Sequence, residues 1–150
     1  MNLDLRRLLE QELEILENAW KVLDYSYQKC QRIGLKEKYE PQELESFETL
    51  TSRFARLSDI LTQKIFRLID EIDLDSGGTV RDRIYRAEKK GLVENADSFI
   101  DIRILRNDIT HEYKPEALED IFNKVLSFTP ILVDSVGRVR RYSQKLLNLR

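Results

Sequence analysis

The apolar residues of this chain recur every three or four positions over almost its whole length. Side chains at that spacing lie on one face of an α-helix, which completes a turn in 3.6 residues. Only 5 Gly and 3 Pro occur among the 150 residues, so few positions can interrupt such helices. Alternation with a period of two, as in a half-buried strand, never lasts more than a few residues. The pattern therefore predicts an all-α protein.

Glycine and proline divide the first half of the chain into two long helices. The first should end at Gly34, because glycine readily takes the left-handed conformation that closes a helix. Pro41 suits the first turn of a second helix, whose apolar stripe continues to Ile72. The run Asp75-Ser76-Gly77-Gly78 then predicts a connecting loop.

The next segments predict a short third helix and a longer fourth one. Thr79 can cap the third helix and Gly91 can end it. Asp97 can cap the fourth helix. That helix should end near Tyr113, because the residue before Pro115 is pushed toward extended geometry.

The fourth helix should turn Ile100, Ile104 and Leu105 inward. A fifth helix should begin at Pro115, and Pro130 should kink it without necessarily ending it. The expected architecture is a single domain over residues 1–150, an antiparallel bundle of four main helices plus a short one.

Composition and charge limit where the protein works and what it can bind. Cys30 is the only cysteine, so an intrachain disulfide is impossible, which fits a reducing compartment. The first sixteen residues lack the apolar core of a signal peptide. They also lack a membrane-spanning segment, which would need about 20 apolar residues. We therefore expect a cytoplasmic protein without a membrane partner. Because the formal net charge is −2, nucleic-acid binding would require a local basic patch.

The only histidine lies in the run Arg106-Asn107-Asp108-Ile109-Thr110-His111-Glu112-Tyr113. Cleavage of RNA by its own 2′-hydroxyl requires a base, an acid and positive charge beside the phosphorane oxygens. His111 can act as acid or base near neutral pH, and the planar fork of Arg106 can meet two phosphorane oxygens. Asn107 shares a helix face with His111 and could orient the site. Arg106 is turned from that face by about 100° and would have to reach back.

A single histidine per chain supplies an acid or a base, but not both at once. A two-fold dimer that pairs the fourth helices would place two sets of Arg106 and His111 around one cleft. We therefore expect a homodimer with a shared site.

Metal chemistry is not expected from this sequence, and neither is a cofactor. No His-rich or Cys-rich ligand spacing occurs. The acids Asp70, Glu71, Asp73 and Asp75 lie near the predicted end of a helix, where solvated carboxylates are common.

The spacing of Arg106, His111 and Tyr113 resembles the motif of the HEPN family, which consists of small all-helical proteins. Many are metal-independent ribonucleases with an active site at a symmetric dimer interface, and many are toxins of toxin–antitoxin pairs. The resemblance covers roughly residues 45–145, including the Arg-Asn dipeptide, the His-Glu-Tyr ending, the helix that starts at proline, and similar segments within 54–64 and 86–92. It implies cleavage of tRNA or mRNA by Arg106 and His111, with Asn107 orienting the site.

The resemblance also implies a way to silence the enzyme. In HEPN toxins with this tyrosine, the partner is typically a minimal nucleotidyltransferase antitoxin (MNT) that transfers AMP to the tyrosine hydroxyl. The acceptor here would be Tyr113. A bulky anion beside Arg106 and His111 would block the cleft and occupy the arginine. The alternative role for Tyr113 is that of a packing aromatic with its hydroxyl at the surface.

Two basic segments could follow an RNA backbone. Residues 136–150 hold five basic residues and no acid, and Arg138, Arg141 and Lys145 share one helical face. The short third helix holds five basic residues, including Arg86, against two acids. Each segment could instead be a solvated face that pairs with the acidic first helix.

Two other functions fit the same residues. The chain could be a non-catalytic helical companion or substrate-binding subunit of a nucleotidyltransferase, with a nucleotide in the same cleft. It could also be a structural helical partner whose motif is accidental. In that case Arg106 would pair with a nearby acid such as Asp101, Asp108 or Glu112.

Overall fold

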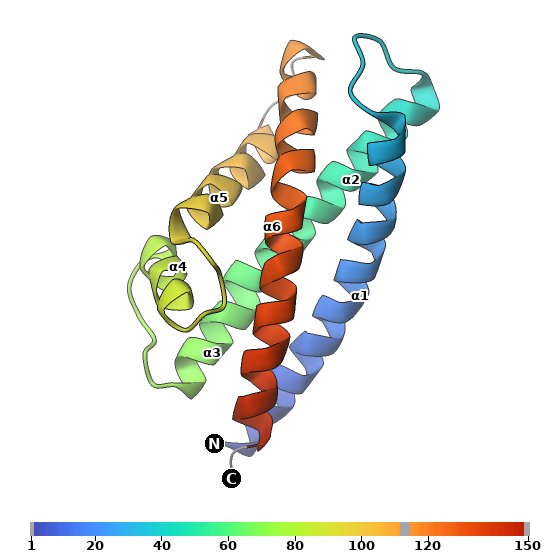
Figure 1. The fold of residues 1–150 in the computed structure, drawn as a ribbon. Helices are drawn as coiled ribbons and strands as arrows, with labels where there is room; N and C mark the ends of the chain where they lie inside the picture. The colour runs from blue at the N-terminus through green and yellow to red at the C-terminus, as the bar shows by residue number, and fades with distance from the viewer. Residues whose placement is uncertain (1, 112–114, 149–150) are drawn as a thin grey trace.

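The computed structural model describes residues 2–111 and 115–148, and all regular secondary structure in them is helical (Figure 1). The elements, in chain order, are α1 (Leu3–Ile33), α2 (Pro41–Asp59), η1 (Ile60–Ile65), α3 (Phe66–Ile72), α4 (Val80–Lys89), α5 (Ala96–His111) and α6 (Pro115–Asn148). The prediction of an all-α protein is confirmed, and four main helices plus a short one are compatible with this order. No helix in the described ranges is long and apolar enough to cross a membrane.

The helices α2, η1 and α3 form one unbroken run that lies at the centre of the packing (Figure 1). The helix α1 packs against this run and against α6. The helices α4 and α5 cover the other flank, where α5 contacts both α2 and α6. The end of α2 therefore faces α5, and this contact positions the predicted site.

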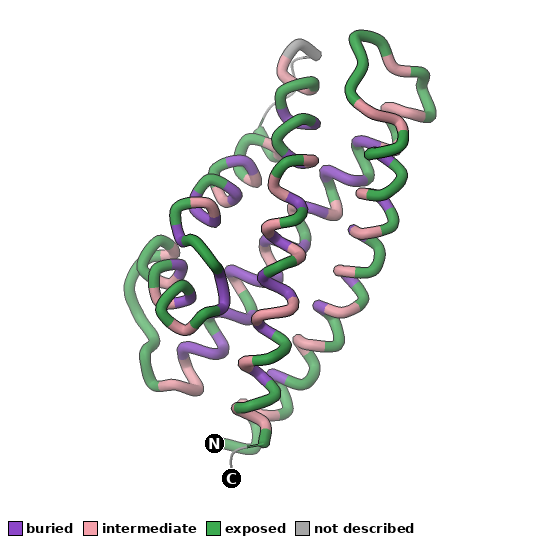
Figure 2. Tube along the Cα trace, in the orientation of Figure 1, coloured by how far each residue is buried: buried purple, intermediate pink, exposed green. Residues whose placement is uncertain are grey.

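The core follows the apolar stripes of the sequence. Buried residues recur along one side of each long helix (Figure 2). Phe47 of α2 and Phe122 of α6 stack with ring centroids 4.7 Å apart, and the ring of Tyr39 packs edge-on against Phe47 at 5.3 Å. Such aromatic pairs contribute about 0.5–1.5 kcal/mol beyond the area they bury.

Most of the predicted helix ends are where the sequence placed them. Gly34 closes α1 with a φ of 75°, and its amide donates to the Cys30 carbonyl. Pro41 begins α2. Thr79 caps α4 in a reciprocal pair with Asp82, in which each side chain accepts a hydrogen bond from the other's backbone amide.

The start of α5 differs from the prediction. The helix begins at Ala96, and the side chain of Asn95, not that of Asp97, accepts the capping hydrogen bond from the Ser98 amide at 3.1 Å. The carboxylate of Glu88 in α4 accepts a bond from the Ala96 amide at 2.7 Å. Asparagine caps a helix as well as aspartate does, so residue type alone does not distinguish the two positions.

The inward face of α5 was predicted only in part. Ile100 and Leu105 are buried as expected, but Ile104 is 51 % exposed and faces away from the core. Phe99 and Ile102 take the remaining core positions, so the buried stripe steps by three residues. The helix α6 continues without a break through Pro130, where Thr129 donates its hydroxyl proton to the Val125 carbonyl at 2.6 Å.

The π-helix η1 has no counterpart in the predicted pattern. The amide of Phe66 donates to the Leu61 carbonyl, five residues back, instead of four. The hydroxyl of Thr62 donates to the Ser58 carbonyl at 2.8 Å, and Arg83 of α4 donates to the Thr62 carbonyl at 3.1 Å. These side chains supply donors to carbonyls around the wide turn.

Candidate nuclease site on α5

The helix α5 carries three of the predicted site residues in its last two turns, and it turns them in two directions. The side chain of Arg106 is partly buried and lies against α2. Asn107 and His111 are exposed. No hydrogen bond joins Arg106 to His111 within the part of the chain that the structure describes. The fourth predicted residue, Tyr113, lies outside the described residues.

Arg106 is held in place by Asp59, the last residue of α2. Its Nε and Nη2 atoms donate to the two carboxylate oxygens of Asp59, each at 2.8 Å. Its Nη1 atom donates to the hydroxyl of Thr110 at 2.5 Å. Arg103 donates to the same carboxylate at 3.0 Å. The hydrogen bonds that Arg106 donates to Asp59 raise the pKa of Arg106 above its ordinary value.

The acid that pairs with Arg106 is therefore not one of the neighbours considered from the sequence. Asp101 and Asp108 form no hydrogen bond with Arg106, and Glu112 lies outside the described residues. Asp59 precedes Arg106 by 47 residues, and only the packing of α5 on α2 brings the two together. A bidentate carboxylate fixes the plane of the guanidinium.

A cavity of about 650 Å³ opens beside this pair, between α5 and the junction of α2 and η1. Its wall carries four basic side chains and one carboxylate, together with one amide and two small or apolar residues. The lining residues are Ala55, Arg56, Asp59, Ile60, Gln63, Lys64, Arg103 and Arg106. The excess of positive charge makes this wall suited to an anion.

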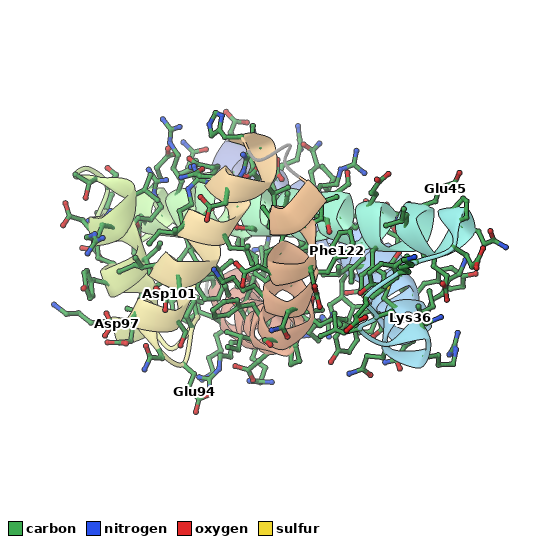
Figure 3. The ribbon with its side chains drawn as sticks, turned by 90° about the horizontal axis from the view of Figure 1, so that it is seen from above. Lys36, Glu45, Glu94, Asp97, Asp101 and Phe122 are labelled. Atoms are coloured by element: carbon green, nitrogen blue, oxygen red, sulfur yellow. The ribbon has the colours of Figure 1, made fainter. Side chains whose placement is uncertain are left out.

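The outward face of α5 has a different character. Ile104, Asn107 and His111 follow one another at helical spacing and are all exposed. Asp97 and Asp101 lie along the same helix, with Glu94 just before its start (Figure 3). The face of His111 is thus partly apolar and partly acidic, while the charge suited to phosphate lies on the Arg106 side.

The basic segment of α4 is largely occupied by internal contacts. Arg86 donates to the Asp70 carboxylate at 3.0 Å and to the Gly77 carbonyl at 2.7 Å. Lys90 binds Asp70 at 2.8 Å and Asp73 at 3.1 Å. Asp70 is therefore not the solvated carboxylate expected from its place near a helix end, because packing of α4 buries it beside two cations.

In the basic segment of α6, two described arginines pair with acids and two other basic residues do not. Arg138 donates to the Asp134 carboxylate at 2.7 Å, and neighbouring Arg140 pairs with Glu17 of α1 at 2.5 Å. Arg141 and Lys145 are exposed, and no ion pair involves them within the described ranges. Of the four residues predicted to follow RNA, only these two are both exposed and uncommitted.

Four charged residues of the cavity wall were not identified as site residues from the sequence, namely Arg56, Asp59, Lys64 and Arg103. The sequence does contain a partial signal, since Arg103 and Arg106 are three apart and therefore neighbours on a helix. The convergence of that pair with Arg56 and Lys64 depends on tertiary packing.

Within residues 2–111 and 115–148, no group of three or more His, Cys, Asp or Glu side chains is arranged to hold a metal ion. Comparison of the chain with protein-family models, with curated proteins and with solved structures gives no match.

Proposed function

We propose that the protein is a metal-independent endoribonuclease of the HEPN type, acting in the cytoplasm as the toxin of a toxin–antitoxin pair. The observation that carries this proposal is the clamped guanidinium of Arg106 at the wall of a cationic cavity, on the same helix as the only histidine. An arginine oriented in this way meets a phosphodiester without having to reorganise. The all-helical fold is compatible with this assignment, and the spacing of Arg106, His111 and Tyr113 resembles the HEPN motif.

The reaction is transesterification within the RNA. The 2′-oxygen attacks the adjacent phosphorus while its proton passes to an imidazole or to water, and the bond from phosphorus to the 5′-oxygen breaks. A second proton, from the general acid, reaches the leaving 5′-oxygen. His111 acts as general acid or base, and Arg106 stabilises the negative charge of the phosphorane. Asn107, exposed one turn before His111, orients the site.

The complete site requires two chains. Arg106 and His111 leave α5 in different directions, so one protomer does not place both on one phosphate. A two-fold axis that pairs two α5 helices would set His111 of one protomer beside Arg106 of its partner. The exposed Ile104, one and two turns before Asn107 and His111, offers apolar contact at that interface.

The proposed antitoxin is a minimal nucleotidyltransferase that attaches AMP to Tyr113. The Tyr113→Phe protein, co-expressed with such a transferase, should not gain the mass of AMP. Mass spectrometry of the intact chain measures this. A Tyr113→Phe protein that still carries the added mass contradicts the assignment of the acceptor.

Cleavage of RNA by the purified protein tests the central proposal. The Arg106→Ala and His111→Ala variants should each lower kcat/KM by about 100-fold or more, because each loses a group that acts in the transition state. Arg7→Ala, at an exposed arginine of α1, is the matched control and should retain full activity. The assay uses mixed tRNA with EDTA present. RNA cleavage by both the Arg106→Ala and the His111→Ala variants at the wild-type rate would refute the proposal.

The second candidate is a non-catalytic subunit that holds a nucleotide for a partner nucleotidyltransferase. The cavity volume favours it, since pockets for small ligands range from about 300 to 1,000 Å³. Under this alternative the protein binds a nucleotide but cleaves no RNA, and its expression alone does not arrest growth.

A further inference from the structure

We propose that the cavity between α5 and the α2–η1 junction is a second phosphate-binding subsite, in which Arg56 and Lys64 hold a phosphodiester next to the one at Arg106. The identity of the ligand as RNA rests on the proposed function, whereas phosphate binding itself does not. The two named side chains are exposed members of the cavity wall.

The first observation is the charge that stays uncompensated. Asp59 already pairs with Arg103 and Arg106, so it is not available to the other two cations. Within the described residues, neither Arg56 nor Lys64 forms an ion pair. Several other basic side chains of the surface have an acidic partner, including Arg6, Lys36, Arg67, Lys124, Arg138 and Arg140. What distinguishes Arg56 and Lys64 is that both line one cavity, whose single carboxylate already has two partners.

The second observation is the position of the π-helix. The turn of η1 contains one more residue than an α-turn, so it rotates the residues beyond it around the helix axis. Ile60, Gln63 and Lys64 of this turn all line the cavity, together with Arg56 one turn before. Single π-turns inside longer helices are frequent at functional sites, and this one supplies three residues to one wall.

The third observation is the composition of the wall. Ala55 and Ile60 add a small apolar area between the cations, which suits the sugar of a nucleotide. The amide of Gln63 accepts a weak hydrogen bond from Arg83 at 3.4 Å and can also donate to a phosphate oxygen. Contacts to phosphate position a strand without reading its sequence. The subsite would therefore set the register of the RNA so that the cleaved bond lies at Arg106.

Binding of a short single-stranded RNA that carries 2′-O-methyl groups, and therefore resists cleavage, tests the subsite. Fluorescence polarisation of the full chain gives the dissociation constant over a range of salt concentrations. The double variant Arg56→Gln/Lys64→Gln should lower the slope of log affinity against log salt by about 1.4, since each lost contact to a single strand accounts for about 0.7. The matched control Lys21→Gln/Arg32→Gln removes the same charge from exposed positions of α1 and should leave the slope unchanged.

An unchanged slope in Arg56→Gln/Lys64→Gln, or an equal drop in the α1 control, overturns the subsite. AMP as a competitor separates the two sources of phosphate. If AMP binding depends on Arg56 and Lys64 while RNA binding does not, the cavity holds a free nucleotide and the RNA subsite is refuted. The salt slope tests the subsite, and RNA cleavage tests the nuclease, so the two proposals can fail independently. The slope can change in a protein that cleaves no RNA, and cleavage can persist in the Arg56→Gln/Lys64→Gln variant.

Discussion

At the scale of single residues, Asp70 is a buried carboxylate that pairs with two cations. Its side chain is 4 % exposed and accepts bonds from Arg86 and Lys90, which join α3 to α4. Burial lowers the pKa of Lys90, but its hydrogen bonds to Asp70 and Asp73 raise it more, so the net shift is upward. A buried carboxylate between two cations holds them in place. Its removal leaves Arg86 without a carboxylate partner and Lys90 with only the more exposed Asp73 and Asp75.

Replacing Asp70 with asparagine should lower the free energy of unfolding by about 3 kcal/mol, because breaking a buried ion pair strands the remaining charges. Asp75→Asn is the matched control, since Asp75 is 52 % exposed and lies 3.4 Å from the same Lys90. Its effect should stay within about 0.5 kcal/mol. Urea denaturation of both variants measures the difference. Equal effects of the two substitutions would show that burial of Asp70 contributes nothing.

Cys30 should be unreactive in the native protein. Its side chain is fully buried, and burial raises the thiol pKa to about 11. The thiolate is the reactive form, so at pH 8 a thiol reagent should modify the native chain only through opening of the structure. The unfolded chain in guanidinium should react with one equivalent at once. Rapid labelling of the folded protein contradicts this prediction.

The raised pKa also sets the direction of a pH effect. The unfolded thiol loses its proton near its ordinary pKa of 9.0, before the native thiol does. The contribution of Cys30 to stability is therefore complete below about pH 9 and falls as the pH rises toward about 11.

At the scale of elements, the ends of the helices are specified locally. Gly91 follows α4 with a φ of 78°, its amide donates to the Glu88 carbonyl at 3.0 Å, and the Leu92 amide donates to the Ala87 carbonyl at 2.8 Å. This pair of bonds is the Schellman motif, which favours glycine because side chains clash in the left-handed conformation. The helix α6 contains the opposite case, because Gly137 lies inside a regular helix.

The same substitution should therefore have opposite effects at the two glycines. Gly91→Ala should destabilise the protein by about 1 kcal/mol, because alanine is strained at positive φ. Gly137→Ala should stabilise it by about 0.5–1 kcal/mol, since alanine is the better helix former and its Cβ would meet Arg141 only at an ordinary 3.5 Å. Thermal unfolding followed by circular dichroism measures both. Shifts of the same sign would mean that backbone conformation does not decide these effects.

At the scale of the whole molecule, the proposed dimer requires that the outer face of α5 forms the interface. Ile104→Arg should convert the protein to a monomer, because it places a charge where two α5 helices would meet. RNA cleavage should fall with it while helix content is unchanged. Analytical ultracentrifugation and circular dichroism measure these two properties.

Ile15→Arg is the matched control for this prediction. Ile15 is 48 % exposed on α1, nearly the same as Ile104 on α5, so it tests an apolar residue of equal exposure on another face. It should leave the dimer intact. A monomer produced by Ile15→Arg and not by Ile104→Arg would place the interface on α1 and refute pairing through α5.

The sequence by itself determined the helices of this protein. Stripes of apolar residues, Gly34, Pro41 and the Thr79 cap act within about a turn of their own positions, so their effects can be read from neighbouring residues. The motif on α5 was visible for the same reason, since its three described members lie within six residues. The π-helix was not visible, because its extra residue does not interrupt the apolar stripe. The contact that Arg83 of α4 makes with its Thr62 carbonyl is a tertiary one.

Only the tertiary structure decided what surrounds the motif. The packing of α5 on α2 brought Asp59 to Arg106 across 47 residues, turned Ile104 outward and gathered four cations around one cavity. Spacing along a helix gives the relative directions of its side chains, but not which of them another helix will cover. The orientation of Arg106 and the charge beside it therefore depended on the fold, because ion pairs between helices act through space and not along the chain.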